Sequence, residues 1–171
     1  MALPSQVIML ILAAGSIGVL LCIRHWAHFA EYAGSGVTMF LSLIAHSIAA
    51  FLCIELVPDA PWATYGVGVL YVATQVFNGA FWMAVHRAML NFVKEDGRVS
   101  YTNVWTIGTS LALAITPVLV GFIVEWFHLQ GFRTCFFLSG AMGMACAVAI
   151  RYAVPDGKPV NRSLSDLMDP A

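Results

Sequence analysis

Long apolar blocks alternate with short polar segments along this chain. Each block holds roughly 20 residues, which is the length that a helix needs to cross the hydrocarbon core of a bilayer. Such blocks are apolar on every face, unlike the striped pattern of a helix on a soluble protein. The sequence therefore predicts an all-α polytopic bundle with five membrane-spanning helices, at residues 5–23, 37–57, 62–86, 104–126 and 132–153.

The segments between the predicted spans carry charge, glycine or proline. Residues 24–36 contain an arginine, two histidines and two glycines, and 58–61 form a turn with proline at both ends, where a helix cannot continue. Residues 87–103 carry the densest charge, and 127–131 are short and end in glycine. The chain thus divides into a membrane bundle (1–153) and a polar tail (154–171).

Composition agrees with a membrane protein and gives it an orientation. Only 10% of the residues are charged and 60% are hydrophobic, whereas about a quarter of a soluble domain is charged. Alternating spans leave Arg133 on one side and seven of the eight cations on the other: Arg24, Arg87, Lys94, Arg98, Arg151, Lys158 and Arg162. By the positive-inside rule we expect the N-terminus outside and the C-terminus in the cytoplasm. We expect the membrane to be a bacterial inner membrane. The cations form no stripe for binding nucleic acid.

One helical face of the third predicted span is polar. Tyr71, Gln75, Asn78 and Trp82 follow one another at intervals of four, three and four residues. In hydrocarbon such side chains need a partner, a cavity or a ligand. The face either lines a path for a solute or forms hydrogen bonds with a neighbouring helix.

The fourth predicted span combines small residues with a proline. Gly108 and Gly121 allow close approach of another helix, and Pro117 removes one hydrogen bond and predicts a kink. Thr116, beside the proline, is a further candidate for lining a solute path.

His46 is a titratable residue in the middle of the second predicted span. Its imidazole is suited to ligating the metal of a tetrapyrrole, to bonding a neighbouring helix, or to relaying protons. The sequence contains no motif for a metal ion and no catalytic constellation, so we expect no enzyme activity. It requires no cofactor, although we expect bound lipid.

The first polar segment contains a recognisable pattern. Trp26, Ala30, Glu31 and Gly34 provide an aromatic start, a small residue, an acid, and a glycine three residues later. This pattern resembles the loop motif of the major facilitator superfamily. The later series of Arg98, Gly108 and Pro117-x-x-x-Gly121 resembles the eleventh helix of such transporters.

This resemblance implies that the five spans correspond to helices eight to twelve of a twelve-helix transporter, a truncated C-terminal half. Transporters of this kind bind substrate between two halves that rock against each other. Two hypotheses follow. The chain is a non-transporting accessory or assembly subunit, held by other transmembrane subunits in a larger complex such as a bioenergetic one. Alternatively, it is part of a split or oligomeric transporter of a small solute.

Overall fold

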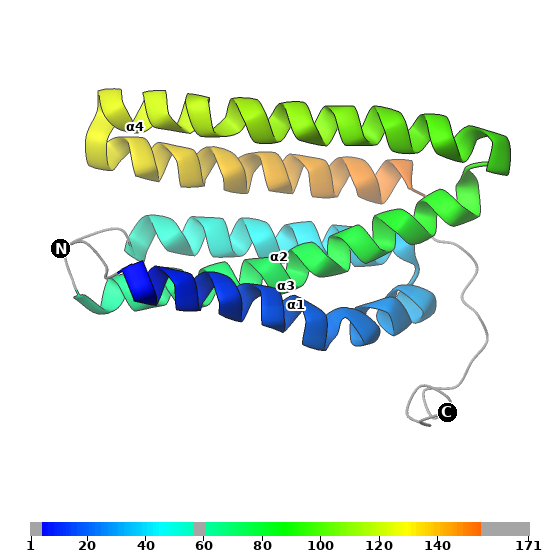
Figure 1. Ribbon diagram of the computed structural model, residues 1–171, viewed down its shortest axis with the longest axis horizontal. Coiled ribbons are helices and arrows are strands. Elements are labelled where there is room, and N and C mark those ends of the chain that lie inside the picture. Colours follow the sequence, from blue (N-terminus) through cyan, green and yellow to red (C-terminus); the bar gives the residue numbers. More distant parts are fainter. Residues whose placement is uncertain (1–4, 57–60, 155–171) are drawn as a thin grey trace.

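The computed structural model describes residues 5–56 and 61–154, and they form an all-helical bundle (Figure 1). Each of its four helices is long and apolar enough to cross a membrane. The helices are α1 (Ser5–Ala33), α2 (Ser35–Leu56), α3 (Pro61–Phe92) and α4 (Glu95–Ala153). Residues 58–60 of the expected turn and most of the polar tail lie outside the described residues, and Pro61 begins α3.

Helices α1 and α2 meet at a single glycine. We expected a connection over 24–36, but α1 continues to Ala33 because its polar residues there are all compatible with a helix. Gly34 has φ 91°, in the left-handed region that glycine adopts without steric cost. The carbonyl of Gly34 then accepts hydrogen bonds from both the backbone N–H and the hydroxyl of Thr38, which lies in the first turn of α2.

Helix α4 contains the chain reversal that the sequence placed at 127–131. Its 59 residues keep helical backbone angles except at His128, with φ 49° and ψ −123°. The first arm of α4 (95–127) and the second arm (129–153) lie side by side in opposite directions (Figure 1). The expected connection at 87–103 is mostly helical as well, since only Val93 and Lys94 separate α3 from α4.

The kink predicted at Pro117 stays a prediction. The α4 backbone stays helical around this residue, and it departs from helical angles at His128 instead. A proline inside a helix removes one hydrogen bond, which the flanking turns tolerate in a membrane. Reversal of the chain needs a residue that can take positive φ, and the proline ring excludes that angle.

The helices pack in the order α1, α3, α2, α4, so that neighbours in the bundle are not always neighbours in sequence. Glycines mark the close contacts. A Cβ built on Gly68 of α3 would lie 2.7 Å from Ile11 Cδ1 of α1. A Cβ on Gly140, in the second arm of α4, would lie 2.8 Å from Phe51 Cε1 of α2. Lateral packing of the bundle therefore depends on the absence of these side chains.

The first arm of α4 contacts little besides the second arm. Most of its side chains between Val104 and Phe127 are exposed. Neither Gly108 nor Gly121 has an atom within 4 Å of where its Cβ would be, so the close packing expected at these glycines does not occur within the described chain. At the start of the arm, Trp105 packs edge-on against Trp82 of α3, with ring centroids 5.2 Å apart.

Replacement of Gly131 by alanine should destabilise the protein by about 1–3 kcal/mol, because the added methyl group meets backbone that cannot rotate away. A Cβ at this position would lie 2.5 Å from the Ile123 carbonyl oxygen and 2.8 Å from Val124 Cα. The control is Gly108→Ala, where open space and the higher helix propensity of alanine predict no loss. Thermal unfolding in detergent measures both, and equal midpoints for the two variants would contradict the packing at the reversal.

Candidate functional site

The polar face of α3 extends from α1 to α4. A Cβ on Gly15 of α1 would lie 3.2 Å from Gln75 Cγ and 3.4 Å from Tyr71 Cε1, so both side chains lie against α1. Trp82, at the other end of the face, contacts Trp105 in the first arm of α4. Asn78 lies between these contacts and is exposed.

The side-chain amides of this face have no hydrogen-bond partner among the described residues. This holds for Gln75, whose stem packs on α1, and for exposed Asn78. Tyr71 and Gln75 therefore pack against α1, but Gln75 makes no interhelical hydrogen bond among the described residues, and Asn78 is presented at the molecular surface. Both interpretations of the face stay predictions.

Thr116 lies exposed in the first arm of α4. Among the described residues no hydrogen bond joins it to the polar face of α3. Its placement in a solute path stays a prediction.

His46 lies at the contact between α2 and the second arm of α4. Its Nε2 is 3.3 Å from the Ser139 hydroxyl, and the ring lies next to the close contact between Ser47 and Gly143. This geometry corresponds to the interhelical hydrogen bond among the three roles considered for His46. The tetrapyrrole role stays a prediction, and the described residues contain no group of three side chains that could hold a metal ion.

The residues of the loop motif form a cluster where α1 ends. Glu31 Oε1 lies 3.3 Å from Arg87 Nη1 of α3, and the second carboxylate oxygen lies 3.8 Å from His28 Nδ1. Ala30 is buried, and Trp26 packs against Phe77 of α3 with ring centroids 5.6 Å apart. The motif therefore ties the ends of α1 and α3 together, while its Gly34 ends α1.

Arg98 has a local structural role that the sequence analysis did not assign. Its guanidinium donates hydrogen bonds to the carbonyl oxygens of Val93, at 3.2 Å, and Leu90, at 3.0 Å. These carbonyls belong to the end of α3, where the last turn of a helix leaves acceptors unpaired. Glu95 lies 3.7 Å from Arg98 Nη1. A basic residue a few positions after a helix end is the signal that points to such a cap.

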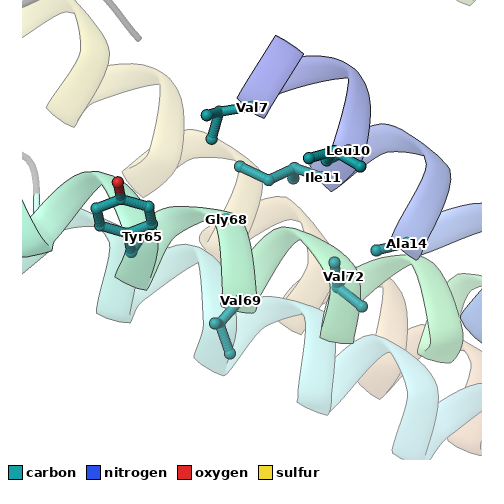
Figure 2. Close-up of a pocket in the computed structure, with 8 residues that line it drawn as sticks. All are labelled: Val7, Leu10, Ile11, Ala14, Tyr65, Gly68, Val69 and Val72. Atoms are coloured by element: carbon teal, nitrogen blue, oxygen red, sulfur yellow. The ribbon is translucent and has the colours of Figure 1, made fainter. Parts of the chain in front are cut away.

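An apolar groove between α1 and α3 also escaped the sequence analysis (Figure 2). It has a volume of about 400 Å³. Apolar residues in a membrane helix carry no signal that separates a groove from a lipid-facing surface, so the pattern alone could not reveal it. The groove is lined by Val7, Leu10, Ile11, Ala14, Tyr65, Gly68, Val69 and Val72.

The ion pair between Glu31 and Arg87 should contribute only modestly to stability. Both side chains are partly exposed, at 38% and 25%, so a double-mutant cycle with Glu31→Gln and Arg87→Gln should give a coupling energy of about 0.5–1 kcal/mol. Thermal or denaturant unfolding in detergent, at low and high salt, measures it. A coupling energy near zero at low salt would show that the contact does not stabilise the bundle.

Comparison with known proteins gives one match. A family model described as Major Facilitator Superfamily matches residues 2–169, which is nearly the whole chain. No curated protein and no solved structure matches the sequence.

Proposed function

Because the chain belongs to the major facilitator superfamily, we propose that it is a component of a membrane carrier for a small solute. In this proposal the polar face of α3 lines part of the solute path. Further helices, from a longer chain or from another polypeptide, complete the path. Members of this family are transporters, and the proposed role is a part in transport.

Exposed Asn78 is the observation that supports this proposal most directly. The residue lies in an apolar helix that is long enough to span a membrane, and its amide has no partner among the described residues. In hydrocarbon an unpaired amide costs several kcal/mol. Asn78 is therefore expected to face water in a solute path or the polar side chain of another helix, and both arrangements need further helices beside α3.

We further propose that the chain crosses the membrane five times, since each arm of α4 is long enough for one crossing. Arg24 and Arg87 near the ends of α1 and α3, Lys94 and Arg98 around the start of α4, and Arg151 at its end then lie on one side (Figure 1). The positive-inside rule makes this side cytoplasmic and places the N-terminus outside.

Substituted cysteines test the environment of Asn78 without knowledge of the solute. In a background where Cys22, Cys53, Cys135 and Cys146 are replaced by alanine, Asn78→Cys should react with a water-soluble methanethiosulfonate. The control is Leu20→Cys. Leu20 is 70% exposed and follows Val19, which contacts Gly79, so its depth matches that of Asn78.

Asn78→Cys should react at least about tenfold faster than Leu20→Cys, because the thiolate is the species that attacks the reagent and displaces methanesulfinate, and a thiolate forms only where water reaches it. The measurement uses the protein in its own membranes, with its natural partners present. Equal, slow reaction at both positions would place Asn78 in a dry environment and remove the solute-path proposal.

A second candidate is the accessory or assembly subunit, and the exposed first arm of α4 favours it. This arm presents Gly108, Pro117 and Gly121 to no other helix of the described chain. Small residues of this kind are enriched where transmembrane helices pack closely. In this proposal another transmembrane subunit packs on the arm, and the chain has a structural role in the resulting complex.

Gly108→Phe and Gly121→Phe test this second candidate. Both residues face open space in the described chain, so neither variant should change the unfolding of the isolated protein. If another subunit packs on these glycines, both variants should lose about 2 kcal/mol or more of association free energy, since a large side chain blocks a close contact. Quantitative co-purification from native membranes measures the loss.

The control for these variants is Leu113→Phe, which changes a residue of the same arm that is 76% exposed and already large. Co-purification that is unchanged in all three variants would contradict a partner on this arm. Loss of a partner together with fast labelling of Asn78→Cys would favour the carrier over a purely structural role.

A further inference from the structure

The apolar groove is built from matching faces of two helices. The lining residues of α1 are Val7, Leu10, Ile11 and Ala14, and those of α3 are Tyr65, Gly68, Val69 and Val72. Both sets follow the spacing i, i+3, i+4 and i+7, which is one side of a helix. Figure 2 shows the two sets on adjacent helices, with Tyr65 at one end.

The groove is apolar along its length and open at its side. Leu10 and Val69 are each 69% exposed, so its walls reach the surface of the bundle. Tyr65 supplies the single polar side-chain group of the lining. A straight path from Tyr65 to Val72 follows about two turns of α3, or roughly 10 Å.

The floor and the inner end of the groove are closed by contacts between the two helices. Beneath it, α3 meets Ile11 at Gly68, where a side chain would not fit. One residue beyond Ala14, Gly15 lies against Tyr71 and Gln75. The apolar groove therefore stops at the polar face of α3, and it is open at its side.

We propose that this groove binds one acyl chain of a membrane phospholipid. Helix α1 has the apolar composition of a membrane span, and only 6% of its most apolar window is buried among the described helices, which leaves this surface open to hydrocarbon. Apolar walls offer water no hydrogen bonds, whereas an acyl chain in the groove makes dispersion contacts with them.

Tyr65 fixes the direction of the bound chain. It lies in the second turn of α3, 61% exposed, at the helix end where tyrosine gathers at a bilayer interface. Its hydroxyl then donates a hydrogen bond to an ester carbonyl of the lipid, and the chain runs inward past Leu10 to Ala14 and Val72. This binding site does not depend on the proposed transport of a solute.

Photolabelling tests the proposal on the full-length protein in nanodiscs of phosphatidylcholine. A small fraction of the lipid carries a diazirine near the middle of one acyl chain, at the depth of the inner end of the groove, and mass spectrometry locates the adducts after irradiation. We expect adducts on Ala14 and Val72 to be several-fold more frequent than adducts on Leu12. Leu12 is 44% exposed on α1 and lies outside the groove.

Two variants sharpen this experiment. Ala14→Phe should fill the inner end and reduce labelling of Val72 to the level of Leu12. Ala13→Phe is the matched control, because Ala13 is the exposed neighbour that does not line the groove, and it should leave labelling of Val72 unchanged. Tyr65→Phe removes only the hydroxyl and should lower labelling of Val72 about two- to fivefold, the effect of one hydrogen bond.

Labelling of Val72 no stronger than that of Leu12 in the wild-type protein would overturn the proposal. So would equal labelling in Ala14→Phe and Ala13→Phe. If Ala14→Phe fails to fold, Tyr65→Phe still decides the matter, since unchanged labelling there would show that no lipid is held at Tyr65. Asn78→Cys reactivity reports on the solute path separately, so the two proposals fail independently.

Discussion

Close contact between helices at glycine positions holds this bundle together. In a bilayer, lipid tails are as apolar as leucine, so helices gain association energy mainly from tight van der Waals packing. Gly15, Gly18, Gly68 and Gly79 each place α1 and α3 so near one another that a Cβ would meet a side chain of the opposite helix within 3.4 Å. Gly140 and Gly143 serve the same purpose between α4 and α2.

Both candidate sites follow from the contact between α1 and α3. The contact turns Tyr71 and Gln75 toward α1, leaves Asn78 exposed, and forms the apolar groove between the same two helices. The ion pair of Glu31 with Arg87 adds a second attachment near the far ends of these helices, and Trp26 packs on Phe77 in the middle of α3. A single helix pair therefore carries the polar face, the groove and the loop motif.

The sequence predicted the helical blocks and the family correctly, because both depend on local apolar length and on motif residues. It did not predict the residues at which the helices begin and end. Charged residues are good helix formers, so α1 continued to Ala33, and α3 and α4 left only Val93 and Lys94 between them. It placed the reversal within α4 correctly at 127–131, where His128 departs from helical angles. For the site, periodicity gave the polar face of α3 but could not identify its neighbours, since spacing defines a side of a helix and not its partner.

The unequal attachment of the two arms of α4 has a mechanical consequence. The second arm is fixed along α2 by Gly140, Gly143 and the hydrogen bond between His46 and Ser139. The first arm is held at one end by Trp105 on Trp82 and at the other by the reversal at His128. Between these two attachments, a change in the curvature of this arm would break few contacts with α1, α2 or α3 of the described chain.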